Sequence, residues 1–156
     1  MSKIITTHLT LGSPVDDVWE TLTTLSQYVA WNPFITSASG TLALGERLDL
    51  TIHPPGGRTM RFKPWVTAVD QHRYLEWLGR VGMPGIFDGR HSFTLTPLTH
   101  ARTLLQQSET FTGALLPFTG SVLDRSRVGF EQMNEALARR VDRTRHDPPG
   151  ASASLP

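Results

Sequence analysis

The residues of this sequence that are best suited to chemistry are a histidine and a carboxylate, His91 and Glu109. His91 lies on the more apolar parity of segment 85–96, and Glu109 shares a parity with apolar residues in segment 102–111. Turn-forming residues at 97–100 predict that the two segments pair as a hairpin. We therefore expect both side chains to lie close together on the inner face of a sheet. This depends on the register, because a slip by one residue would turn Glu109 outward.

An imidazole beside a carboxyl in an apolar pocket can exchange protons with a substrate, as general acid and general base. The same two groups can instead hold a ligand by hydrogen bonds, or form a buried pair that only positions the strands. His91 and Glu109 are therefore the candidate catalytic residues, with these two alternatives open. The candidate ligand-binding residues are the aromatic, thioether and amide side chains expected around the same pocket: Trp31, Phe34, Trp77, Phe87, Phe93, Gln107, Phe111, Phe130 and Met133.

The first elements that must position these residues are a strand and two short helices. Segment 6–11 is rich in β-branched residues and predicts a strand. Ser13 is predicted as the N-cap of a short amphipathic helix, with Pro14 in its first turn. Ser26 is predicted to cap a second short helix that ends at Asn32, because the residue before a proline avoids helical geometry.

The rest of the chain predicts a run of about six strands and then one long helix. The segments that favour β structure most clearly are 47–53, 58–69, 74–81, 85–96 and 102–111. A helix of about 25 residues follows, because apolar residues recur at helical spacing: Phe118, Val122, Phe130, Met133, Leu137 and Val141. We expect one domain over residues 1–146 and a disordered tail over residues 147–156, which are rich in Pro, Ser and Ala.

This order of elements comes with four sequence motifs: SPVDDVW at 13–19, YVAWNPF at 28–34, FDGRHSF at 87–93 and GFEQMN at 129–134. Together they resemble the bacterial polyketide cyclase/dehydrase-like branch of the SRPBCC superfamily, which includes the START and birch-pollen-allergen proteins. The resemblance implies an α+β helix-grip fold, in which a curved antiparallel sheet of about seven strands surrounds a long C-terminal helix, with two short helices after the first strand.

The resemblance also implies a cavity between sheet and long helix that takes an apolar small molecule. It places Trp31 and Phe34 near the mouth of that cavity, where they would close over a ligand. The alternative is that they form a hydrophobic plug under the second short helix. Residues 21–45 carry no formal charge, as expected for a segment that borders an apolar cavity.

Composition excludes several other kinds of site. The 156 residues include 15 Lys and Arg, 14 Asp and Glu, and no Cys. The net charge of +1 gives no electrostatic case for a nucleic-acid partner. The absence of Cys excludes disulfides, thiolate zinc sites and a cysteine nucleophile. The six His lack the spacing of metal ligands, and no phosphate-binding glycine loop is present, so we expect neither a metal nor a cofactor.

Two further expectations concern the location of the protein and its partners. No apolar run is long enough to span a membrane, so we expect no integral membrane association. The N-terminal residues lack the long apolar stretch of a secretory signal, which favours the cytoplasm. The expected partner is a hydrophobic small molecule, and no feature of the sequence specifies an oligomeric state.

The function predicted from these observations is the binding of a hydrophobic or aromatic, lipid- or polyketide-like molecule by a carrier or sensor. One alternative is a cyclase- or dehydratase-like enzyme in which His91 and Glu109 move protons. Another is a protein-interaction module whose cavity is filled by its own side chains. A closed core would favour the last alternative, whereas an open pocket would favour the first two.

Overall fold

The computed structural model describes residues 1–146, and the predicted tail over residues 147–156 lies outside the described residues. The elements follow in the order β1 (Ser2–Leu11), α1 (Val15–Thr23), η1 (Leu25–Gln27), α2 (Tyr28–Trp31), β2 (Ile35–Ser39), β3 (Asp49–Ile52), β4 (Met60–Phe62), β5 (Trp65–Asp70), β6 (Tyr74–Val81), β7 (Phe87–Thr99), β8 (Arg102–Thr112), η2 (Leu116–Phe118) and α3 (Gly120–His146). The two η elements are short 3₁₀ turns. This α+β order, with two short helices after the first strand and a long C-terminal helix, confirms the predicted helix-grip-like fold.

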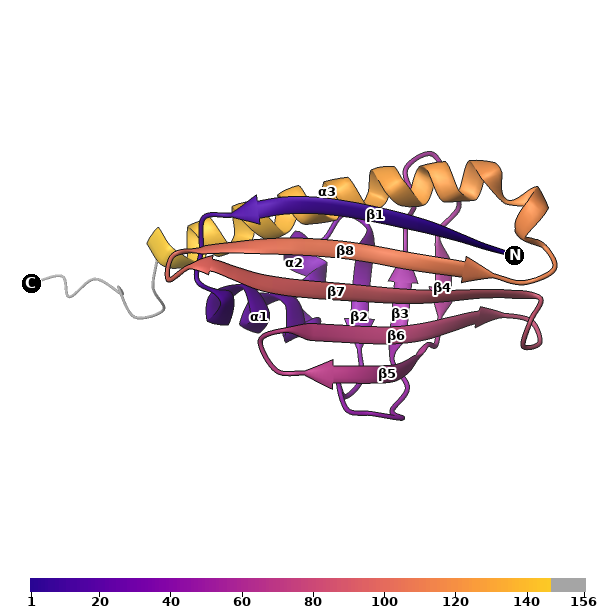
Figure 1. The fold of residues 1–156 in the computed structure, drawn as a ribbon, viewed down its shortest axis with the longest axis horizontal. Coiled ribbons are helices and arrows are strands. Elements are labelled where there is room, and N and C mark those ends of the chain that lie inside the picture. Colours follow the sequence, from indigo (N-terminus) through magenta and orange to yellow (C-terminus); the bar gives the residue numbers. More distant parts are fainter. Residues whose placement is uncertain (147–156) are drawn as a thin grey trace, which may run out of the picture.

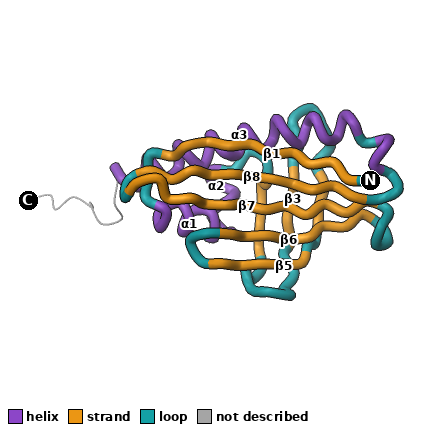
Figure 2. The backbone as a smooth tube through the Cα atoms, in the orientation of Figure 1, coloured by secondary structure: helices purple, strands orange, loops and turns teal. Residues whose placement is uncertain are grey.

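The strands form two antiparallel sheets. The larger sheet has the order β1-β8-β7-β6-β5, and the smaller one has the order β2-β3-β4. In Figure 1 the strands of the smaller sheet lie behind the larger sheet and run across its strands, while α3 extends along the β1 edge. Figure 2 shows α1 and α2 gathered near one end of the larger sheet. The inner face of the larger sheet is therefore covered by different elements along its length.

The described chain has eight strands in two sheets, where about seven strands in one sheet were expected. The difference arises in segment 58–69, which divides into β4 and β5 because Pro64 cannot donate a hydrogen bond to a continuous ladder. Its carbonyl accepts a hydrogen bond from the Leu48 amide at 2.9 Å. A single bridge between Arg47 and Trp65 then links the two sheets at this bend.

The segment before α1 differs from the prediction. Ser13 does not cap this helix: Pro14 occupies the N-cap position, and no side chain caps the helix. The Ser13 hydroxyl is buried without a hydrogen-bond partner among the described residues, while its carbonyl accepts a bond from the Thr103 hydroxyl at 2.8 Å. Pro14 has an extended backbone, and its fixed φ sets the turn into the helix.

The second short helix is also built differently. Ser26 lies inside the 3₁₀ turn η1 and caps nothing. The predicted end at Asn32 is confirmed, since α2 stops at Trp31. The Asn32 side-chain oxygen accepts hydrogen bonds from the Phe34 and Ile35 amides at 3.0 and 2.9 Å, which turns the chain into β2.

The long helix has 27 residues, close to the predicted length, but its apolar face starts later than expected. Phe118 belongs to η2 and is 83% exposed, and Val122 is also exposed, so neither lies on the buried face. For Phe118 the reason is that the helical period does not extend through the 3₁₀ turn. Val122 lies in the first turn of α3 and lines the cavity described below. The buried face consists mainly of Leu123, Phe130, Met133, Leu137 and Val141.

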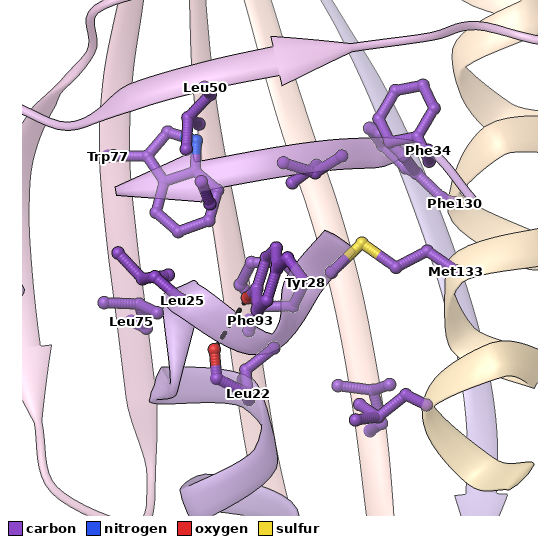
Figure 3. Close-up of a cluster of buried hydrophobic side chains, with 14 of the residues drawn as sticks. Leu22, Leu25, Tyr28, Phe34, Leu50, Leu75, Trp77, Phe93, Phe130 and Met133 are labelled. Atoms are coloured by element: carbon purple, nitrogen blue, oxygen red, sulfur yellow. Dashed lines mark hydrogen bonds between the residues drawn. The ribbon is translucent and has the colours of Figure 1, made fainter. Parts of the chain in front are cut away.

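The core lies between the larger sheet, the two short helices and the part of α3 from Phe130 onward (Figure 3). Tyr28 of α2 is fully buried there, and its hydroxyl donates a hydrogen bond to the Leu22 carbonyl at 2.6 Å. Burial raises the pKa of this hydroxyl, because the phenolate would lose its hydration. The Trp31 ring packs edge-on against Tyr28, with ring centroids 5.0 Å apart. The two short helices therefore plug one end of the sheet.

The outer face of the larger sheet carries a polar network around Glu76. Its carboxyl accepts hydrogen bonds from Tyr74 at 2.5 Å, Thr67 at 2.7 Å and Arg90 at 2.6 Å. Partial burial raises the pKa of Glu76, but these hydrogen bonds and the Arg90 charge outweigh that effect and hold it below its usual value. The network stabilises the strands that position the site without reaching into it.

Candidate ligand-binding site

An apolar cavity of about 290 Å³ opens between the two sheets and the N-terminal half of α3. Its floor is the inner face of β6, β7 and β8, and the opposite side consists of β2, β3, β4 and the loops beside them. The helix contributes Val122 and Ser126, and the loop before it contributes Leu115 and Thr119. Apart from the hydroxyls of Thr119 and Ser126, the polar side chains on this lining are His91 and Glu109.

The structure brings His91 and Glu109 together as the parity argument predicted. They are cross-strand partners in the β7–β8 ladder, and both line the cavity. Their closest atoms are His91 Nδ1 and Glu109 Oε2, at 3.4 Å, so the contact is long for a hydrogen bond. The His91 side chain is 5% exposed and the Glu109 side chain 18% exposed. Glu109 is therefore the more accessible of the two groups.

The orientation of His91 is fixed by aromatic rings and by Gln107. The imidazole stacks on Trp77, with centroids 5.3 Å apart and planes at 8°, and meets the Phe130 ring edge-on at 4.8 Å. The Gln107 amide nitrogen lies 3.0 Å from His91 Nε2. In this orientation the Gln107 amide nitrogen donates and Nε2 accepts, so a neutral ring carries its proton on Nδ1, facing Glu109.

Aromatic side chains form much of the remaining lining. Phe87 and Phe111 stack with ring centroids 5.6 Å apart and planes at 20°. Phe34, just before β2, closes the cavity from the opposite side and packs edge-on against Phe130 at 5.5 Å. These rings offer flat apolar surfaces on two sides of the cavity.

The predicted site residues divide into two groups. Those that line the cavity are Phe34, Trp77, Phe87, His91, Glu109 and Phe111. Those that lie outside its lining, in the adjoining core, are Trp31, Phe93, Gln107, Phe130 and Met133. Gln107 and Phe130 contact His91 from behind, and Gln107 also donates to the Met133 sulfur at 3.5 Å. This second group supports the lining.

The two residues that were predicted to close over a ligand, Trp31 and Phe34, also differ in position. Phe34 faces the cavity, whereas Trp31 packs on Tyr28 within the core. The short turn between them is held by the Asn32 side chain. Trp31 therefore lies in the position of a plug and Phe34 in the position of a cavity-closing residue.

Sequence reasoning missed the contributions of the smaller sheet and of two glycines. Leu50, Ile52 and Phe62 line the cavity from β3 and β4. Gly79 and Gly89 line its floor as cross-strand partners. The signal for the glycines was their place inside strands, where glycine is disfavoured unless a ligand or another chain segment comes close.

The mouth of the cavity is rimmed by exposed apolar side chains. Met60, Val81, Leu115 and Val122 belong to the lining and are partly exposed to solvent. They come from β4, β6, the loop after β8 and the first turn of α3. The cavity is therefore open between the ends of these elements, so a ligand can enter there.

Residues 1–146 lack two other features, a membrane-spanning helix and a cluster of metal ligands. No helix in this range is both long and apolar enough to cross a membrane. In the same range no three His, Asp or Glu side chains lie together as metal ligands would.

The fold recurs in many solved structures. Protein MLL2253 from Mesorhizobium loti is 21% identical, with a TM-score of 0.72 over 91% of this chain and 98% of that one. A START superfamily protein from Mycobacterium smegmatis is 19% identical, with a TM-score of 0.72 over 90% of this chain and 97% of that one. The Zhui aromatase/cyclase from Streptomyces sp. R1128 is 18% identical, with a TM-score of 0.69 over 96% of this chain and 99% of that one. At these identities the similarity shows the fold alone.

The family comparison is more direct. No curated protein matches the sequence. Residues 4–143 match the model of the family described as polyketide cyclase / dehydrase and lipid transport, which covers β1 through nearly all of α3. The chain therefore belongs to the polyketide cyclase/dehydrase and lipid transport family.

Proposed function

We propose that the protein binds a hydrophobic or aromatic small molecule in the cavity between its two sheets and α3, and acts as a carrier or sensor of that molecule. The observation that carries the proposal is the open apolar cavity itself. A cavity of this kind, with few polar groups, is the usual form of a small-molecule site. Membership in a family of lipid-transport and polyketide-cyclase proteins supports a hydrophobic ligand.

The cavity volume favours a ligand with about two rings. An engineered apolar cavity of about 150 Å³ takes one benzene molecule. The cavity of about 290 Å³ is roughly twice that size and lies at the lower end of the range for drug-sized ligands. A longer molecule fits only if part of it extends through the mouth between Met60 and Val122.

The polar pair gives such a ligand one preferred orientation. His91 and Glu109 lie side by side on the floor of a cavity whose other surfaces are mostly apolar. A polar substituent on the ligand gains hydrogen bonds only next to this pair, since burying it elsewhere leaves it unsatisfied. The proposed role of His91 and Glu109 in this function is therefore ligand orientation.

The first experiment is native mass spectrometry of the freshly purified protein, followed by titration with the neutral fluorescent probe N-phenyl-1-naphthylamine. We expect either a co-purified apolar molecule or saturable probe binding. Ser126→Leu should weaken binding at least tenfold, because it adds a larger apolar side chain to the helical side of the cavity. Ser121→Leu is the matched control, since Ser121 is exposed on the same helix. Absence of both a co-purified molecule and probe binding would refute the proposal.

A second candidate function is a cyclase- or dehydratase-like enzyme, and the contact between His91 Nδ1 and Glu109 Oε2 favours it. An imidazole and a carboxyl at this spacing can remove a proton next to a ligand carbonyl and supply one to a departing hydroxyl. Membership in a family whose description includes polyketide cyclase and dehydrase supports the same chemistry.

Substitutions of the pair distinguish the two functions. Glu109→Gln and His91→Ala would be assayed for probe binding and for cyclisation of a short poly-β-ketone thioester. If binding is retained and measurable turnover is abolished, the enzyme is favoured. If binding falls and the parent protein shows no turnover, the carrier or sensor is favoured. A protein-interaction module with a filled core is the least supported alternative, because it requires a cavity closed by the chain's own side chains.

A further inference from the structure

Two glycines face each other in the floor of the cavity, where the neighbouring positions carry large side chains. Gly79 of β6 and Gly89 of β7 are cross-strand partners, and both line the cavity. On β6 the inward positions before and after Gly79 are Trp77 and Val81, both of which also line it. Gly79 therefore leaves a shallow slot in the floor, bordered by Gly89, which we call the Gly79–Gly89 slot.

The packing of the protein does not require a glycine at position 79. Its φ lies outside the left-handed region that favours glycine. A Cβ atom built there meets nothing closer than the Gly89 carbonyl at 3.8 Å and the Pro64 Cβ at 4.0 Å, which are ordinary contacts. Alanine would fit, and it would suit a strand better than glycine does. The space above Gly79 is thus left free by the protein itself.

The role of Gly89 is different, because it makes room for Glu109. A Cβ atom on Gly89 would overlap the Glu109 Oε1 atom, so the carboxyl group leans over the glycine. The other oxygen, Oε2, faces His91. Among residues 1–146 no hydrogen bond reaches Oε1. The slot is therefore bordered by a carboxyl oxygen that is free to accept a hydrogen bond.

We propose that the Gly79–Gly89 slot takes the face of a planar aromatic ring whose hydroxyl group donates a hydrogen bond to Glu109 Oε1. This inference rests on the proposed function and names the class of its ligand. Four steps along the strand lead from Trp77 to Val81, or about 13 Å at the usual rise, which leaves room for a flat ring between them. Because Gly79 has no Cβ, the ring can lie directly on the Gly79 backbone, with the Glu109 Oε1 atom over Gly89 at its edge. A puckered saturated ring is thicker and would be held away from it.

The test uses three matched probes and isothermal titration calorimetry of the full chain. The probe 2-naphthol has two planar rings and a hydroxyl, naphthalene lacks the hydroxyl, and decahydro-2-naphthol has the same skeleton without planarity. The parent protein should bind 2-naphthol at least fivefold more tightly than either of the other two. Comparable affinity for decahydro-2-naphthol would refute the planar slot, and comparable affinity for naphthalene would refute the hydrogen bond.

Two variants then distinguish the contribution of the slot to binding from that of the Glu109 carboxyl group. Gly79→Ala adds one methyl group to the slot, so it should weaken 2-naphthol and naphthalene binding by about tenfold each. Glu109→Gln should weaken 2-naphthol binding and leave naphthalene binding unchanged, because it removes the charge from the acceptor. Gly120→Ala is the control, since a Cβ there meets nothing within 4 Å and Gly120 is not part of the lining.

The melting temperature of Gly79→Ala shows whether Gly79 has a purely structural role. We expect Gly79→Ala to melt at the parent temperature or above it. A drop of several degrees would mean that the glycine serves the shape of the sheet, and would overturn the inference. Unchanged 2-naphthol affinity in Gly79→Ala would also overturn it while leaving the proposed function intact. If the parent binds none of the three probes and no apolar molecule by the earlier assays, the proposed function fails as well.

Discussion

The contact between Gly129 and Phe34 predicts that a substitution favourable to the helix will destabilise the protein. Gly129 lies in the middle of α3, where alanine is the better helix former by about 1 kcal/mol. A Cβ atom at position 129 would, however, overlap the Phe34 ring. That ring is 4% exposed and packs edge-on against Phe130, so it has little freedom to move within the core. Gly129→Ala must push Phe34 toward the cavity.

The size of the effect follows from three terms. Overpacking a core costs about 1–3 kcal/mol, and we take about 2 kcal/mol for a rigid ring. Tilting Phe34 away from Phe130 loses an aromatic contact of about 1 kcal/mol. Subtracting the gain in helix propensity of about 1 kcal/mol leaves a net destabilisation of about 2 kcal/mol. For a chain of this length that lowers the melting temperature by about 4–8 °C.

Urea denaturation followed by circular dichroism would measure the change in the free energy of unfolding. A double-mutant cycle provides the decisive comparison. In a Phe34→Leu background the ring is gone, so Gly129→Ala should be neutral or stabilising there. The displaced ring should also weaken binding of N-phenyl-1-naphthylamine in the single variant. Equal destabilisation in both backgrounds, or a more stable single variant, would refute the reasoning.

Three further predictions concern individual polar groups. Glu76→Gln should be less stable than the parent near neutral pH, and the gap should shrink as the pH falls from about 6 to about 3, measured by urea denaturation at each pH. The reason is that the pKa of Glu76 in the folded protein lies below its usual value of 4.5. The ionised carboxylate therefore stabilises the folded state fully above pH 4.5, and this stabilisation is lost as the pH falls through the folded-state pKa. A constant gap would contradict it. Tyr28→Phe should lower the free energy of unfolding by about 1–2 kcal/mol, because the buried Leu22 carbonyl loses its donor, and chemical denaturation would detect this. Nitrogen-15 NMR of labelled histidine should show His91 with its proton on Nδ1 at neutral pH; a signal from the Nε2–H tautomer would contradict the hydrogen bond seen in the structure.

The inner faces of the central strands could be predicted from the sequence, because large apolar residues favour one parity in each strand. In β6, β7 and β8 the apolar parity matches the inward face, and the turn after β7 brings His91 opposite Glu109. A strand with neighbours on both sides and one buried face has little freedom in register. The predicted contact between His91 and Glu109 was therefore the most secure part of the candidate site.

The errors fall where local patterns compete with the surrounding structure. Ser13 has the residue type of an N-cap, but Pro14 takes that place and the Ser13 carbonyl is used by Thr103. Phe118 has the spacing of a helical core residue, but it precedes the helix in a 3₁₀ turn. Pro64 divides a segment that otherwise resembles one strand. The cavity depends on the smaller sheet closing over the larger one, and no single segment encodes that closure.

Two parts of α3 explain why a cavity forms at this place. The part from Phe130 onward buries Phe130, Met133, Leu137 and Val141 and so packs the core. The part before Phe130 leaves Val122 partly exposed and, apart from Leu123, buries only Ser126 and Gly129, whose side chains are small or absent. The sheet beneath this first part is thus incompletely covered, and the smaller sheet encloses the remaining space. Large-to-small changes from Phe130 onward should therefore act mainly on stability, whereas changes in size at the lining residues Val122 and Ser126 act mainly on what the cavity can hold.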